Sequence, residues 1–320
     1  WALGQAVLPV LCARRLRRRF PHAWPRPGRL TQEAARSYLG RSLWMSVGQV
    51  SQLLISGTDV ILIGAILGPA AVVQYVVTGR LLAVGAALPG IVAHAASPAL
   101  SELRAGGDRT ALERSTSALL LAVLLGGGAV VTVVLAVNSG FVAWWVGGDL
   151  YGGATLTVLM AAQHLLRHAG TALAFSVFAF GFERRLALVG VAEGGATALL
   201  TALLLSHLGL AAAPLGSLAV VAGLTIPALG RALVGTTGTT VASLARRLLP
   251  LGARCAIVFA TAFLMSMVVT PSDFLSLAAL TAAALAWYAL LAGPIALRDP
   301  VRGYTLQVWS LVKGRWASRA

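Results

Sequence analysis

Long apolar stretches, separated by short polar loops, follow one another along most of the chain. A helix needs about 20 apolar residues to cross the hydrocarbon core of a bilayer. By that measure the sequence predicts eight complete crossings, at residues 43–66, 71–98, 116–138, 152–180, 186–206, 212–234, 254–270 and 274–297. Residues 1–12 are interpreted as the last part of a further, partial membrane helix. Strands are not expected, because lipid cannot satisfy the hydrogen-bonding groups of an open sheet edge. The pattern therefore predicts an all-α polytopic membrane protein.

The composition of the chain agrees with this fold class. Of the 320 residues, 58% are hydrophobic and 11% are charged, whereas about a quarter of the residues in a soluble domain are charged. The mean hydropathy is +0.83. Cys12 and Cys255 both lie in apolar runs, so neither a disulfide framework nor a cysteine metal site is expected.

The basic residues predict how the helices are oriented. Of the 25 lysines and arginines, 22 fall in loops and termini on one side of the predicted crossings, and the loops on the other side contain none. Since basic loops stay in the cytoplasm, residues 13–42 and the C-terminal tail are predicted to be cytoplasmic. The net charge of +15 is spread over these loops rather than gathered in one patch, so nucleic-acid binding is not expected.

The loops on the other side are too short to carry the catalytic groups of a membrane enzyme. Their only ionisable residues are Asp149, His207 and Asp273, and no metalloprotease, serine-hydrolase or P-loop motif occurs. The glycine run in LLGGGAV (124–130) lies within an apolar stretch and indicates close helix packing rather than a nucleotide loop. Neither enzymatic activity nor a cofactor is expected, and movement of a substrate across the bilayer is favoured.

Four polar residues share one face of the first complete helix. Gln49, Gln52, Ser56 and Asp59 are spaced by three, four and three residues, so they align along about 15 Å of helix. Such a stripe fits hydrogen bonding between helices. It also fits the wall of a water-accessible cavity, and the ionisable Asp59 favours this second interpretation.

An arginine in the next helix is the natural counterpart of that stripe. Arg80 lies at a depth similar to that of Asp59, so the two side chains are expected either to pair directly or to leave Arg80 facing a cavity. In the cavity arrangement its planar guanidinium group would bind an anion, and phosphate oxygens suit its geometry. His94 follows 14 residues later on the same face.

The fourth helix carries a second polar group, in AAQHLLRHAG (161–170). His164 and His168 lack a further ligand for a metal site, so with Arg167 they indicate a proton-responsive polar face or polar packing. Glu193 in the fifth helix is expected to pair with a nearby arginine, Arg167 among them, or to take part in ion coupling. The residues predicted to line a substrate cavity are therefore Arg80, Asp59, Gln52, Gln49, Ser56, His94, Arg167, His164 and His168.

Two adjoining segments resemble a known transporter family. DVILIGAILGPAAVVQYVVTGRLL (59–82), followed by ASPALSELRAGGDRTALERS (96–115), is similar to the polysaccharide and lipid-linked oligosaccharide flippases of the multidrug/oligosaccharidyl-lipid/polysaccharide exporter superfamily. The shared pattern is an Asp before an apolar run, then a Tyr, an Arg-Leu pair in the next helix and a short charged loop. The resemblance implies that Arg80 meets the diphosphate of a polyprenyl-linked sugar and that Asp59 occupies an acidic position of the family.

The resemblance also implies a domain organisation. Family members have two six-helix lobes around a central cavity, of which this chain would contain the second. The predicted parts are a truncated helix at 1–12, a basic inter-lobe segment at 13–42, the second lobe at 43–235, a cytoplasmic loop at 236–253, an additional hairpin at 254–297 and a cytoplasmic amphipathic tail at 298–320.

These observations favour a flippase of the bacterial inner membrane that moves polyprenyl-diphosphate-linked oligosaccharide by alternating access. Protonation or sodium binding at Asp59 or Glu193 is a hypothesis for what drives the cycle. Other membrane proteins of glycan assembly are expected as partners. Two alternatives remain: a drug or cation antiporter of the same superfamily, whose cavity would favour carboxylates and aromatic rings, and a non-transporting scaffold, in which Asp59 and Arg80 pair inside a dry bundle.

Overall fold

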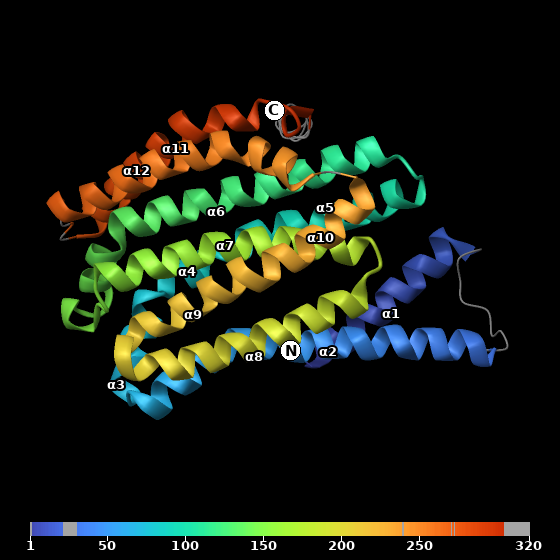
Figure 1. The fold of residues 1–320 in the computed structure, drawn as a ribbon, viewed down its shortest axis with the longest axis horizontal. Coiled ribbons are helices and arrows are strands. Elements are labelled where there is room, and N and C mark those ends of the chain that lie inside the picture. The colour runs from blue at the N-terminus through green and yellow to red at the C-terminus, as the bar shows by residue number, and fades with distance from the viewer. Residues whose placement is uncertain (1, 22–30, 239, 270, 272, 304–320) are drawn as a thin grey trace. The chain divides into compact units, whose positions relative to one another are not determined.

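The structure is a computed structural model that describes residues 2–21, 31–238, 240–269, 271 and 273–303. All regular elements in this part of the chain are helical (Figure 1). The chain divides into two units, residues 1–43 and 44–320. The predicted tail helix lies almost entirely outside the described residues.

The first unit contains α1 (Ala2–Arg19) and the beginning of α2 (Gln32–Ile66). Arginines occupy the last turn of α1, at Arg17, Arg18 and Arg19, and positive charge there is favourable because the carbonyl groups of a helix point toward its C-terminus. The predicted inter-lobe segment, residues 13–42, therefore includes the end of one helix and the start of another, with residues 22–30 outside the described part.

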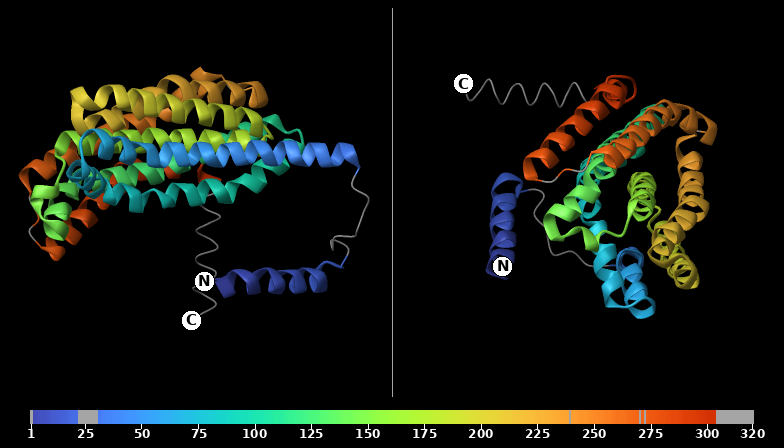
Figure 2. Two further views of the ribbon diagram at one scale, coloured as in Figure 1. Left: turned by 90° about the horizontal axis from the view of Figure 1, so that it is seen from below. Right: turned by 90° about the vertical axis from the view of Figure 1, so that its left-hand side faces the viewer.

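The second unit holds the remaining helices, which run side by side in roughly one direction (Figures 1 and 2). After α2 they are α3 (Pro69–Thr78), α4 (Arg80–Gly85), α5 (Ala87–Ala105), α6 (Arg109–Val146), η2 (Gly148–Leu150), α7 (Ala154–Ala179), α8 (Glu183–Leu208), η3 (Gly209–Ala211), α9 (Ala212–Val220), η4 (Val221–Thr225), α10 (Ile226–Thr237), α11 (Val241–Val268) and α12 (Phe274–Ala296).

Six helical stretches among the described residues are long and apolar enough to cross a membrane, which makes the chain a multi-pass membrane protein. They are Gln32–Ile66, Arg80–Ala105, Arg109–Val146, Glu183–Thr237, Ala242–Val268 and Phe274–Ala296. The predicted count of eight is not confirmed. One reason is that α7, although 26 residues long, carries polar side chains in its middle. The other is that α8 to α10 form one continuous helical stretch by this measure.

Helix α6 is the centre of the second unit. It packs against α5, α7, α11 and α12, and Val123, Val131 and Val142 along it are at most 2% exposed. The glycine run within it allows these close contacts: a side chain added at Gly127 would meet the ring of His168 on α7, and one added at Gly128 would meet Tyr288 on α12. The glycines therefore serve helix packing, as the sequence indicates.

The hairpin formed by α11 and α12 is fixed to α6 by polar contacts at two levels. The Tyr288 hydroxyl donates to the Leu125 carbonyl at 2.7 Å, and Arg247 pairs with Glu113 at 2.8 Å. Helix α12 matches the prediction closely, whereas α11 begins at Val241, within the stretch predicted as a loop.

The predicted helix over residues 71–98 is divided into three parts, α3, α4 and α5. The joints are Gly79 and Ala86. Gly85, just before the second joint, lies directly against Val130 of α6, where no side chain would fit without movement. The second joint therefore lies at a point of close approach to α6.

Asn138 of α6 stabilises the first of these joints. Its side-chain nitrogen donates to the Thr78 carbonyl at 3.0 Å and to the Thr157 hydroxyl at 3.1 Å. The Thr78 hydroxyl in turn accepts from the backbone nitrogen of Gly152 at 2.8 Å. Asn138 is 1% exposed, so water cannot reach the Thr78 carbonyl and the Thr157 hydroxyl from this side. The Asn138 side chain supplies their hydrogen bonds instead.

Replacing Asn138 with leucine is expected to lower the free energy of unfolding by about 1–3 kcal/mol, because a buried carbonyl and hydroxyl lose their donor. Denaturant unfolding of the purified protein in detergent micelles measures this. Thr132→Val is the matched control, since Thr132 is equally buried but bonds only to Gly128 in its own helix. Equal stability of the two variants would show that the Asn138 bonds contribute nothing beyond packing.

Candidate substrate cavity

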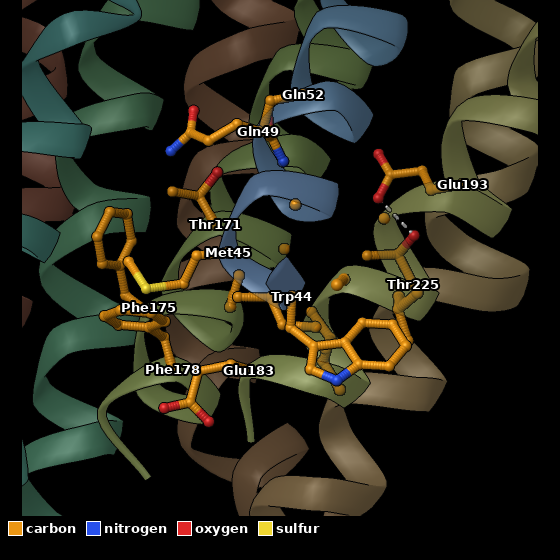
Figure 3. A pocket seen from close by; sticks show the side chains of 18 of the residues that line it. Trp44, Met45, Gln49, Gln52, Thr171, Phe175, Phe178, Glu183, Glu193 and Thr225 are labelled. Carbon is orange, nitrogen blue, oxygen red and sulfur yellow. Dashed lines mark hydrogen bonds between the residues drawn. The ribbon is translucent and has the colours of Figure 1, made fainter. Parts of the chain in front are cut away.

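A cavity of about 530 Å³ lies within the second unit, between α2, α5, α7, α8, η4 and α10. Its size falls in the range of small-molecule binding sites. Figure 3 shows its two ends. The polar end carries Gln49, Gln52, Thr171, Glu193 and Thr225.

The opposite end of the cavity is mainly apolar. Trp44 and Met45 of α2 and Phe175 and Phe178 of α7 line it, and they form the aromatic end (Figure 3). Glu183, in the first turn of α8, is the charged residue there. A cavity with one polar and one apolar end suits an amphipathic ligand better than a small hydrophilic one.

An ion pair forms part of the cavity wall. Arg167 Nη1 lies 3.4 Å from Glu193 Oε1, and Arg167 Nη2 donates to the Ser217 hydroxyl at 3.1 Å. The Thr225 hydroxyl donates to Glu193 Oε2 at 2.8 Å. Glu193 is 7% exposed. Because an isolated charge is costly in a membrane interior, these contacts offset the cost of burying the two charged groups.

Two glycines bring α8 close enough to α2 to place Glu193. A side chain added at Gly190 would lie 3.1 Å from Ser51, and one added at Gly194 would lie 3.2 Å from Leu54. Both distances are tighter than ordinary contact, so a side chain at either position would crowd α2. Glu193 lies between these glycines and therefore faces α7 and η4 rather than lipid.

Arg184 contacts one ring of the aromatic end, and Arg104 and Arg185 make further contacts at neighbouring helix ends. The guanidinium group of Arg184 lies over the Trp44 ring at 5.4 Å, and that of Arg104 lies over the Phe182 ring at 5.3 Å. Arg185 donates to the Ala228 carbonyl at 2.8 Å. Cation–π contacts of this kind hold a guanidinium group in place while leaving its edge free for an anion.

Five of the residues singled out from the sequence line this cavity: Gln49, Gln52, His94, Arg167 and Glu193. His94 also contacts the Phe175 ring edge-on, with ring centroids 4.4 Å apart. Of the partners proposed for Glu193, the structure selects Arg167.

Arg80 and Asp59 do not meet in the structure. Arg80 is exposed and is not part of the cavity lining. Asp59 is 8% exposed and accepts a bond from Thr201 on α8 at 3.5 Å. Two ion pairs that the described residues do form are Arg167–Glu193 and Arg247–Glu113. The prediction of this pair treated residues 71–98 as one continuous helix. In the structure that stretch has a joint at Gly79, directly before Arg80.

The other predicted lining residues also lie outside the cavity. Ser56 is exposed, and its hydroxyl donates to the Leu53 carbonyl of its own helix. His164 and His168 bond to each other, with their Nε2 atoms 2.8 Å apart. Such a bond requires one ring to donate and the other to accept. No group of three or more metal-ligating side chains occurs in the described part of the chain.

Several residues of the site were not anticipated from the sequence. Trp44 begins the second unit and looks like an ordinary interfacial residue, and Ser217 and Thr225 look like hydroxyl groups that bond within their own helix. The one available signal was Pro227, which follows Thr225 closely and interrupts regular helix hydrogen bonding.

Comparison of the chain with family models, with curated proteins and with solved structures gives no match. The cavity and the sequence resemblance are therefore the basis for a functional interpretation.

Proposed function

We propose that the protein moves polyprenyl-diphosphate-linked oligosaccharide across a bacterial inner membrane by alternating access. The observation that carries this proposal is the Arg167–Glu193 pair in the wall of an amphipathic cavity within a membrane bundle. The resemblance of residues 59–82 and 96–115 to lipid-linked oligosaccharide flippases supports the same substrate class. Arg167 takes the anion-binding role that the sequence pattern gave to Arg80.

The chemistry of the pair suits a diphosphate. A guanidinium group binds phosphate oxygens through two parallel hydrogen bonds, as it binds a carboxylate. A diphosphate can therefore replace the Glu193 carboxylate on Arg167 without leaving the arginine unpaired. Gln49 and Gln52 at the polar end then face the sugar hydroxyls, and the aromatic end takes the first isoprene units.

The arginines near the aromatic end attract the same ligand. Arg104 and Arg184 lie at the ends of helices that the charge pattern assigns to the cytoplasmic side. Positive potential there raises the local concentration of anionic head groups before they enter the cavity. This is the leaflet from which a lipid-linked sugar precursor would start.

Release of Glu193 from Arg167 also suggests how an ion could drive the cycle. When the diphosphate occupies Arg167, the Glu193 carboxylate is left buried with Thr225 as its donor, and a proton or a sodium ion would offset its charge. Asp59 is a second acidic group of the same region, close enough to Arg167 for an electrostatic interaction. Membrane proteins of glycan assembly remain the proposed partners.

A specific observation favours a second candidate, a drug or cation antiporter. The cavity lining contains two carboxylates, Glu183 and Glu193, but one guanidinium group, Arg167, along with the rings of the aromatic end. Carboxylates and aromatic rings bind lipophilic cations, so the lining residues by themselves suit such a substrate. The scaffold alternative is disfavoured, because it requires an Asp59–Arg80 pair and a bundle without a cavity.

Transport by the purified protein in proteoliposomes separates the two candidates. One population is given a fluorescent polyprenyl diphosphate carrying an oligosaccharide, and the other is loaded with ethidium. We expect protein-dependent movement of the lipid between leaflets and no protein-dependent movement of ethidium. Ethidium movement without lipid movement would replace the flippase proposal with the antiporter.

A further inference from the structure

The helical stretch that closes one side of the cavity contains a π-helical turn. Residues Val221–Thr225 form η4 between α9 and α10. The backbone nitrogen of Ile226 donates to the Val221 carbonyl, five residues back. The next residue, Pro227, has no N–H, so the Gly223 carbonyl lacks the donor that an α-helix would provide. The proline accounts for the local departure from α-helical bonding.

The turn lies between two residues that hold the ion pair. Ser217, on α9 before the turn, accepts from Arg167 at 3.1 Å. Thr225, the last residue of the turn, donates to Glu193 at 2.8 Å. Both hydroxyl groups are buried, at 0% and 4% exposure. The Arg167–Glu193 pair is therefore bonded to this helical stretch at two points, one before the π turn and one at its end.

A π turn contains one residue more than the α-helical turn it replaces, and that residue decides which way Thr225 points. Removing one residue would rotate everything after it by about 100° and shift it by about 1.5 Å. Thr225 would then leave Glu193, while Ser217 would keep its place on Arg167. Leu229, which lines the cavity on α10, would rotate with Thr225.

π turns inside helices are frequently found at functional sites. We propose that η4 is the positioning element of the cavity: its extra residue sets Thr225 against Glu193, and this contact holds η4 against α8 beside the Arg167–Glu193 pair. Ser217 and Thr225 are positioning residues, since each acts through a charged partner. The part of this proposal that concerns substrate affinity rests on the proposed function, whereas the part that concerns the cavity wall does not.

The consequence for substrate binding follows from the two hydroxyl bonds. With Thr225 in place, one oxygen of Glu193 is occupied by the hydroxyl and the other by Arg167. Without Thr225, both carboxylate oxygens are free to take Arg167, and an incoming anion has to displace a stronger ion pair. Loss of the Thr225 contact therefore weakens anion binding and, by releasing η4 from Glu193 on α8, exposes the cavity wall.

Three variants test the register of the turn: Thr225→Val, Thr225→Ser and deletion of Gly223. Thr236→Val is the matched control, because Thr236 on α10 bonds only to Ala232 of its own helix. All are made with Ala187→Cys in a background of Cys12→Ser and Cys255→Ala, so that a cysteine at a lining position that is 1% exposed reports on opening of the cavity wall. The two readouts are the maleimide labelling rate of that cysteine without ligand and the Kd for polyprenyl diphosphate.

We expect Thr225→Val and the Gly223 deletion to raise the labelling rate severalfold and the Kd about tenfold, the effect of losing a hydrogen bond to a charged group. Thr225→Ser and Thr236→Val are expected to match the parent protein. If the deletion variant does not fold, the valine and serine variants decide the question.

Wild-type labelling and Kd in Thr225→Val would overturn the positioning role of η4. A raised labelling rate in that variant, combined with no polyprenyl diphosphate binding by the parent protein, would retain the positioning role and remove the proposed substrate. Altered labelling in Thr236→Val as well would overturn the specific role of Thr225.

Discussion

Replacing Arg167 with methionine is expected to lower the free energy of unfolding by about 3 kcal/mol, because it leaves a buried carboxylate without its cation. Methionine keeps much of the length of the side chain and removes its charge. Glu193 is 7% exposed, so few water molecules can reach its carboxylate to replace the lost partner. The same variant is expected to move lipid-linked diphosphate no faster than protein-free vesicles. Denaturant unfolding in micelles and the proteoliposome assay measure the two effects.

A second substitution shows whether the pair itself is responsible. Arg167→Met combined with Glu193→Gln removes both charges, so more than half of the lost stability is expected to return, while transport stays absent. Arg231→Met is the matched control, since Arg231 is exposed on α10 and surface substitutions change stability by about 0.5 kcal/mol or less. If Arg167→Met were as stable as this control, the ion pair would not be buried in the folded protein.

The glycine run of α6 provides the second large effect. Gly128→Ala is expected to lower the free energy of unfolding by about 1–3 kcal/mol, as overpacking does in other cores. The new methyl group would lie 2.6 Å from the Tyr288 hydroxyl oxygen and 3.1 Å from its ring. The ring cannot withdraw without breaking its 2.7 Å bond to the Leu125 carbonyl.

Gly126→Ala is the internal control for this substitution. It lies in the same run, two residues away, and its nearest neighbour would be Pro89 at an ordinary 3.7 Å. Alanine there is expected to leave stability unchanged or to raise it by up to about 1 kcal/mol, because alanine favours helix more than glycine does. Thermal unfolding of both variants in the same detergent gives the comparison. Equal melting temperatures would show that Tyr288 and α6 are farther apart in the folded protein.

Apolar runs and glycine patterns were enough to predict the all-α membrane fold. A helix that crosses lipid must satisfy its backbone groups internally, so length and hydropathy decide the element. The bounds of α12 follow almost directly from its apolar run. The division of residues 71–98 was not predictable in this way, because its joints, Gly79 and Ala86, occur within one long, mainly apolar stretch.

The candidate site was predicted in part. Gln49 and Gln52 were recognised because polar residues at helical spacing do not face lipid, and Arg167 and Glu193 because a buried charge needs a partner. Which partner each charge takes depends on how α7, α8 and α9 are placed, and the sequence carries no signal for that placement. Arg80 was misplaced for the same reason: its depth in the helix could be inferred from the sequence, whereas the helices beside it could not.

The three adjoining glycines of α6 have a consequence for how the hairpin relates to the rest of the protein. At Gly127 and Gly128 the helix is no thicker than its own backbone, with the His168 imidazole against one residue and the Tyr288 phenol against the next. Only the backbone of α6 separates the two rings, so a displacement of one ring is expected to shift this backbone and, with it, the other ring. The α11–α12 hairpin is therefore part of the packed bundle, and a substitution that moves Tyr288 is expected to displace His168 of α7 as well.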